Sequence, residues 1–175
     1  MNLHHQILQE LSKANVNKMT DYVGADEERF AELVQIFLKG NYITTQRSSW
    51  ILSECVAAHP SLIYPFFNDF FKKLHEENIH PSVRRNTIRI WQFIETPEEH
   101  IGEVYNICFR YLSSNEAIAV IVFSMTVCHN ITKRIPELKS ELQFMLEDLL
   151  QKHQHGSAGI AHRAKKILAE MKKKC

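Results

Sequence analysis

The sequence predicts an all-α fold made of four pairs of helices, with one further helix before the first pair. Apolar positions recur with helical spacing at steps of 37 or 38 residues, and Pro60, Pro97 and Pro136 each separate two long helical patterns. No segment alternates with period two, and the chain has only five glycines and five prolines, fewer than strand-rich folds need. We expect a single domain over residues 1–175, with repeats at 26–58, 61–95, 97–133 and 136–173.

The first helix of each pair, the A helix, carries an apolar stripe at positions i, i+3, i+4 and i+7. In the first repeat these residues are Phe30, Leu33, Val34 and Phe37. The same positions are apolar or Cys in the next three repeats: Phe67, Phe70, Phe71 and Leu74, then Val104, Ile107, Cys108 and Tyr111, then Leu142, Met145, Leu146 and Leu149. A stripe of this kind faces the core of a globular protein. We place the A helices near 26–39, 61–77, 97–113 and 136–152.

The second helix of each pair, the B helix, has a different pattern. Its apolar face in the second repeat is Val83, Thr87, Ile90 and Ile94, at i, i+4, i+7 and i+11. The second position is small in every repeat, which lets a helix approach its neighbour closely; its residues are Ser49, Thr87, Ser124 and Ala161. We place the B helices near 43–58, 82–95, 115–133 and 157–173.

An amphipathic helix is also expected before the first repeat. Leu3, Ile7, Leu8 and Leu11 fall on one face of it. Stacks of repeats need terminal units with a polar outer surface, so we interpret this segment as a cap.

This layout resembles the HEAT/armadillo class of α-solenoids over residues 26–173. Two helices in a short repeat favour the HEAT type over the three-helix armadillo type. The segment SVRRNTIRIWQFI, from Ser82 to Ile94, looks most like a HEAT second helix, with Val83 and Arg84 at the family's Val-Arg pair. The other repeats hold Gln46, Ile121 and Ala158 at the position of Arg84, so the family's Arg–Asp ladder is not kept. The resemblance implies a right-handed α-α superhelix, with the B helices along its concave face.

A candidate binding surface follows from the B positions that point away from the apolar face. In the second repeat these are Arg85, Arg89 and Gln92. The equivalent positions are Arg47, Ile51 and Glu54 in the first repeat, Val122, Thr126 and His129 in the third, and Gly159, Arg163 and Lys166 in the fourth. We therefore predict a concave strip with Arg47, Glu54, Arg85, Arg89, Gln92, His129, Arg163 and Lys166. Val122 and Thr126 interrupt the charge, either as an apolar contact for a partner or because the register slips there.

The predicted strip is basic, although the formal net charge of the chain is only +1. Arginine binds planar anions through paired hydrogen bonds, and charged grooves concentrate opposite charge. Our leading hypothesis is a non-enzymatic interaction module that binds an acidic segment of a partner protein. The alternative is that these arginines are solvated or paired within the protein.

Nucleic-acid binding is the second hypothesis. HEAT-like bacterial DNA glycosylases that remove alkylated bases are similar in architecture, and this resemblance implies aromatic and acidic groups at the lesion. Trp50, Trp91 and Glu54 are the candidates here. The near-neutral net charge and the lack of a matching active-site motif weigh against this function. A third hypothesis is end-to-end pairing of repeat stacks, and the oligomeric state stays open.

The sequence contains no motif for catalysis, and we expect no cofactor and no metal. GxSxG, HExxH and Gly-rich phosphate loops are all missing, and neither His4 with His5 nor His153 with His155 has zinc-ligand spacing to Cys or carboxylates.

Four cysteines are scattered along the chain. Cys55, Cys108 and Cys128 fit the interior of helices, and Cys175 stands alone at the end. The start of the chain, MNLHHQILQELSK, does not resemble a signal peptide, and no apolar run is long enough for a bilayer. We therefore expect a cytoplasmic protein with reduced thiols.

Overall fold

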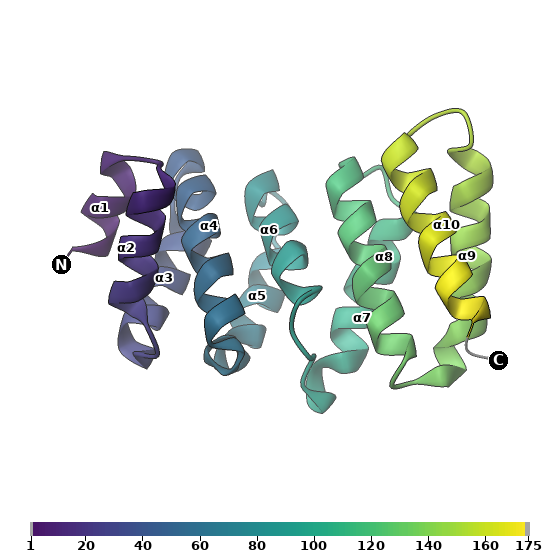
Figure 1. The fold of residues 1–175 in the computed structure, drawn as a ribbon, viewed down its shortest axis with the longest axis horizontal. Coiled ribbons are helices and arrows are strands. Elements are labelled where there is room, and N and C mark those ends of the chain that lie inside the picture. Colours follow the sequence, from purple (N-terminus) through teal and green to yellow (C-terminus); the bar gives the residue numbers. More distant parts are fainter. Residues whose placement is uncertain (1, 174–175) are drawn as a thin grey trace. The chain divides into compact units, whose positions relative to one another are not determined.

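The computed structural model describes residues 2–173, and within this range every regular element is a helix (Figure 1). The chain divides into two compact units, unit 1 (Met1–Ile94) and unit 2 (Glu95–Cys175). Unit 1 contains α1 (Leu3–Gln9), α2 (Lys13–Val23), α3 (Glu27–Lys39), α4 (Tyr42–Ala58), α5 (Phe67–Leu74) and α6 (Pro81–Trp91). Unit 2 contains α7 (Ile101–Leu112), α8 (Ile118–Thr132), α9 (Lys139–Lys152) and α10 (Ala158–Lys172). One domain over 1–175 stays a prediction.

The predicted helix pairs are present in both units. In unit 1 the B helices α4 and α6 form one layer and the A helices α3 and α5 the other, and unit 2 is built in the same way from α8 and α10 with α7 and α9 (Figure 1). Each B helix packs against the A helix of its own pair. The all-helical class that the repeat predicts is therefore confirmed.

The prolines alter how three of the A helices begin. Short 3-10 helices at Pro60–Phe66, Glu98–His100 and Pro136–Leu138 precede α5, α7 and α9, so each α-helix starts later than predicted. Proline is tolerated in the first turn of a helix, because its missing N–H would have no partner there, and 3-10 turns are common at such ends. Pro65 adds a second break before α5, which explains why that helix begins only at Phe67.

The predicted apolar stripe of the A helices forms the core of each unit. All of its residues are buried except Met145, which is half-buried. In unit 1 the stripe is aromatic: the ring centroids of Phe37 and Phe70 lie 6.2 Å apart, and Phe67 stacks on Trp91 at 5.8 Å. Offset and tilted ring pairs of this kind add to the free energy gained from burial.

The small residues of the B helices are buried as expected in three of the four repeats. Ser49, Thr87 and Ser124 are 5%, 0% and 0% exposed, whereas Ala161 is half-buried. Close to the first of them, the hydroxyl of Thr45 donates to the carbonyl of Phe37 at 3.1 Å and ties α4 to the end of α3. A hydroxyl that bonds a backbone carbonyl can be buried without leaving a polar atom unsatisfied.

The N-terminal region differs from the prediction, because the expected cap α1 is followed by a second helix. Residues Val16, Met19 and Val23 of α2 are buried, Ser12 caps its first turn, and Gly24 ends it with φ of 50°. α2 packs against α4 as a neighbouring B helix would. Ile51, which the repeat pattern placed on the outward face of α4, is only 1% exposed and belongs to the core.

Two phenylalanines of unit 1 test this account of the core. Phe70→Ala removes a ring that is 0% exposed, and we expect it to lower the free energy of unfolding by about 3–5 kcal/mol. Phe93→Ala is the matched control: its ring is 72% exposed, and we expect a change within about 0.5 kcal/mol. Both tryptophans, Trp50 and Trp91, lie in unit 1, so their fluorescence in a urea titration reports this unit. An equal decrease in the free energy of unfolding for the two variants would show that the core residues are assigned wrongly.

Candidate interaction surface

Two arginines on α6 belong to the exposed part of the predicted strip in unit 1. Arg85 and Arg89 lie one helical turn apart and are exposed, while Val83, Thr87 and Ile90 on the other side are buried. Side chains at i and i+4 project from the same face of a helix. Among residues 2–173 neither guanidinium makes a hydrogen bond or an ion pair. Both are therefore available to a ligand.

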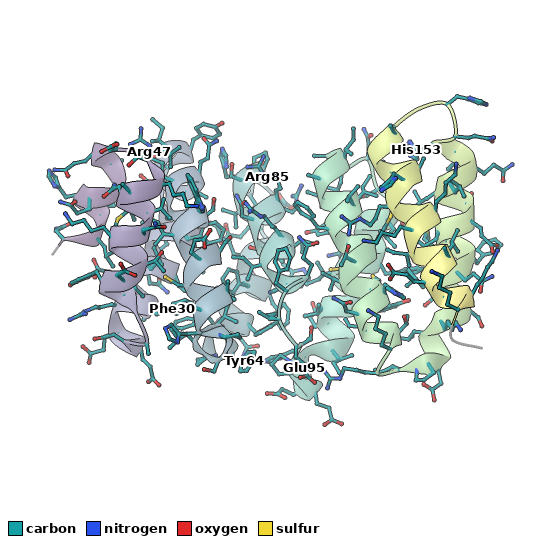
Figure 2. All side chains as sticks on the ribbon, viewed as in Figure 1. Phe30, Arg47, Tyr64, Arg85, Glu95 and His153 are labelled. Carbon is teal, nitrogen blue, oxygen red and sulfur yellow. The ribbon has the colours of Figure 1, made fainter. Side chains whose placement is uncertain are left out.

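Arg47 has a different role, because it caps another helix. One of its guanidinium nitrogens donates to the carbonyls of Leu8 at 2.7 Å and Ile7 at 3.3 Å, in the last turn of α1. These carbonyls have no partner inside their own helix, and a cation is favourable at the negative end of the helix dipole. Figure 2 shows Arg47 and Arg85 near the same end of their helices.

The remaining predicted residues of unit 1 lie on the same two helices, α4 and α6, which pack side by side. The carboxylate of Glu54 is exposed and accepts a hydrogen bond from the indole N–H of Trp50 at 3.0 Å. Gln92 is half-buried and occupies the C-cap of α6. The structure thus brings Arg85, Arg89 and Glu54 to neighbouring helices, with the acid already bonded locally.

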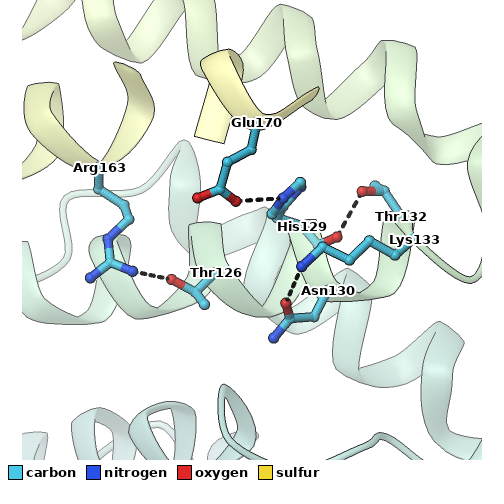
Figure 3. A network of polar contacts seen from close by, with 7 residues as sticks. All are labelled: Thr126, His129, Asn130, Thr132, Lys133, Arg163 and Glu170. Atoms are coloured by element: carbon cyan, nitrogen blue, oxygen red, sulfur yellow. Dashed lines mark hydrogen bonds and ion pairs between the residues drawn. The ribbon is translucent and has the colours of Figure 1, made fainter. Parts of the chain in front are cut away.

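In unit 2 the predicted positions bridge the two B helices. A guanidinium nitrogen of Arg163 on α10 donates to the hydroxyl of Thr126 on α8 at 2.9 Å (Figure 3). Three residues further along α8, Nε2 of His129 lies 3.2 Å from a carboxylate oxygen of Glu170 on α10. The position at which the sequence predicted a gap in the strip, Thr126, therefore accepts a hydrogen bond from the arginine of the next repeat. Lys166, between these two contacts, is exposed and makes no contact of this kind with any described residue.

The predicted basic residues therefore fall into two groups. Arg85, Arg89 and Lys166 point to solvent without a partner in the described chain, whereas Arg47, Arg163 and His129 hold helices together. The sequence contained a signal for the second group: Thr126 and Arg163 are 37 residues apart, which is one repeat, so they occupy equivalent places on adjacent B helices. No sequence signal pointed to Glu170 or to the carbonyls of α1.

Trp91 does not fit the base-repair role considered from the sequence. It is 1% exposed and stacked on Phe67, so it cannot stack on a base that enters from solvent. Trp50 is half-buried and its indole N–H is bonded to Glu54. Trp91 thus serves to pack the helices of unit 1.

The described cysteines are unsuited to act as nucleophiles. Burial raises the pKa of the Cys55 thiol from 9.0 to about 12, and it also raises the pKa values of Cys108 and Cys128. A nucleophilic cysteine needs the opposite shift, because the thiolate is the reactive form. Cys175 lies outside the described residues.

Residues 2–173 contain neither a metal-binding cluster nor a membrane-spanning helix. This part of the chain has no group of three or more His, Cys, Asp or Glu side chains placed to hold a metal ion. None of its helices combines the length and apolar character needed to cross a bilayer.

The comparison with known protein families supports the assignment of the chain to paired helical repeats. The family model described as a HEAT repeat domain matches residues 3–171, a range that includes α1 and α2. Repeats of this family generally mediate interactions between proteins and are typically non-enzymatic scaffolds. No curated protein and no solved structure gives a significant match to the chain. The predicted resemblance and the α-solenoid class are both confirmed.

Thiol reactivity tests the burial of the cysteines. In a Cys175→Ser variant we expect the three buried thiols to resist Ellman's reagent at pH 8 while the protein is folded and to react when urea unfolds it. The raised pKa of Cys55 also makes the stability of the protein depend on pH. The buried neutral thiol contributes fully to the free energy of unfolding below about pH 9. This contribution is lost as the pH rises toward 12, because the thiol of the unfolded chain ionises first. A thiol that reacts at once in the folded protein would contradict this assignment.

Proposed function

Because the chain belongs to the HEAT repeat family, we propose that it is a non-enzymatic interaction module that binds an acidic segment of a partner protein. The observation that carries this proposal is the pair of exposed guanidinium groups of Arg85 and Arg89, which have no anionic partner in the described chain. An exposed guanidinium group without an anionic partner can donate paired N–H hydrogen bonds to a carboxylate.

The spacing of the two arginines suggests the shape of the ligand. Residues four apart in an α-helix are separated by about 6 Å along its axis. Carboxylates two residues apart on an extended chain lie about 7 Å apart and on the same side. An extended segment with two acids separated by one residue therefore matches Arg85 and Arg89 when it runs along α6.

The basic residues of unit 2 support the same class of partner. Lys166 is exposed on α10, and Arg163 still has donors to offer, because a guanidinium carries five N–H groups and Thr126 takes one. We also propose a cytoplasmic location, which suits the free thiols of Cys55, Cys108 and Cys128.

A peptide titration tests this function. We expect a fluorescein-labelled peptide with the sequence Glu-Ser-Glu at its centre to bind the protein, and the same peptide with Gln-Ser-Gln to bind more weakly. Arg85→Ala/Arg89→Ala should weaken the binding roughly tenfold, because it removes two ion pairs worth about 0.7 kcal/mol each. Fluorescence anisotropy measures the affinity, and circular dichroism checks that the helix content is unchanged.

The matched control removes two cations from A helices. Lys72 on α5 and Arg110 on α7 are exposed and have no ion pair in the described chain, so Lys72→Ala/Arg110→Ala should leave the affinity unchanged. Equal losses in the two double variants would refute a specific role for α6. Tighter binding to a DNA duplex, with a steep decrease as salt rises, would instead favour the nucleic-acid alternative.

A further inference from the structure

A half-open pocket of about 490 Å³ lies in unit 2, where the ends of α8 and α10 meet the segment that leads into α9. This volume is within the range of roughly 300–1,000 Å³ that is usual for small-molecule sites. The residues that line it include His129, Lys133, Lys139, Glu170, Met171 and Lys173.

The rim of this pocket is basic. Its lysines come from three places in the chain: Lys133 follows α8, Lys139 begins α9 and Lys173 follows α10. The ammonium of Lys133 donates to the side-chain oxygen of Asn130 at 3.1 Å (Figure 3), which leaves two of its three donors. Lys139 and Lys173 have no polar partner among residues 2–173.

One carboxylate, that of Glu170, also lines the pocket, but it is already engaged. A carboxylate oxygen of Glu170 lies 3.2 Å from Nε2 of His129, a contact that links α10 to α8 (Figure 3). Three lysines and a single, already bonded carboxylate therefore line the pocket, which has an excess of positive charge. Such an excess in a concave site attracts anions.

The inner wall of the pocket is mainly apolar. Met171 is 4% exposed and His129 7% exposed, and Pro136, in the short helix before α9, also lines the pocket. Nearby, the hydroxyl of Thr132 is bonded to the carbonyl of His129 at 2.9 Å, so it presents no unsatisfied donor. A ligand that fits must combine an apolar body for this wall with a negative charge for the rim.

We propose that this pocket binds an apolar carboxylate, with its apolar body against Met171 and its carboxylate among Lys133, Lys139 and Lys173. The carboxylate could belong to a free organic acid or to the C-terminal residue of a peptide, because both present the same chemistry. None of these residues is shared with the Arg85 and Arg89 pair on α6, so this proposal and the proposed function can fail separately.

Methyl NMR on the full chain tests the proposal, with methionine methyl groups labelled with ¹³C. Met171 reports the pocket, and Met125, which is 0% exposed in α8, is the internal reference. We expect 4-phenylbutyrate to shift the Met171 signal in a saturable manner, while the neutral 4-phenylbutyramide does not. A tetrapeptide ending in Leu-Phe, with a free or an amidated C-terminus, repeats the comparison for the peptide source.

The lysines provide the decisive variants. Lys133→Gln/Lys139→Gln should weaken binding of the acid roughly tenfold or more, because it removes two charge-assisted hydrogen bonds to the carboxylate. Lys152→Gln/Lys165→Gln removes two exposed lysines of the same unit outside the pocket and should have no effect. The proposal is supported if 4-phenylbutyrate or the tetrapeptide with a free C-terminus binds saturably, and if this binding is lost in Lys133→Gln/Lys139→Gln but not in the control variant. An equal response to the amides, no response to either acid, or equal effects of the two variants would overturn it.

Discussion

The burial of one apolar stripe on each A helix, against the B helix of the same pair, is the contact on which the rest of the structure depends. It fixes which side of every helix faces inward, and so it also fixes which side chains remain for the surface. In unit 1 the contact is largely aromatic, with Phe37, Phe67 and Phe70 buried together with Trp91. The small buried residues of the B helices, such as Ser49 and Thr87, permit this close packing.

A second consequence of stacking helices in rows is that some surface charges are used to join neighbouring helices. Arg47 bonds the free carbonyls at the end of α1, and Arg163 bonds Thr126 across two B helices. Cations of this kind contribute to the stability of the stack and have fewer donors left for a partner. Within residues 2–173, B-helix positions without such a neighbour, above all Arg85 and Arg89, present their charge to solvent.

The helix pairs were predictable from the sequence because their signal is repeated four times, so that a local error in one repeat is corrected by the others. α2 was not predicted, because Val16, Met19 and Val23 form a short stripe outside the repeats that defined the register. Which arginines are bonded within the protein and which are free for a partner could not be predicted either. It depends on which group lies opposite in space, such as the end of α1 opposite Arg47, and a helical period contains no such information. The lysine pocket was missed for the same reason, since its residues come from separate ends of helices.

The central claim, that the arginines of the B helices divide into a structural and an accessible group, is tested most directly by comparing two single variants of unit 1. Arg47→Met and Arg85→Met each keep an unbranched side chain and remove a charge. Urea unfolding followed by tryptophan fluorescence should show a loss of about 0.5–1.5 kcal/mol for Arg47→Met, because the substitution removes its hydrogen bonds to the carbonyls at the end of α1. The change for Arg85→Met should be within about 0.5 kcal/mol. Equal losses, or a larger loss for Arg85→Met, would contradict the claim.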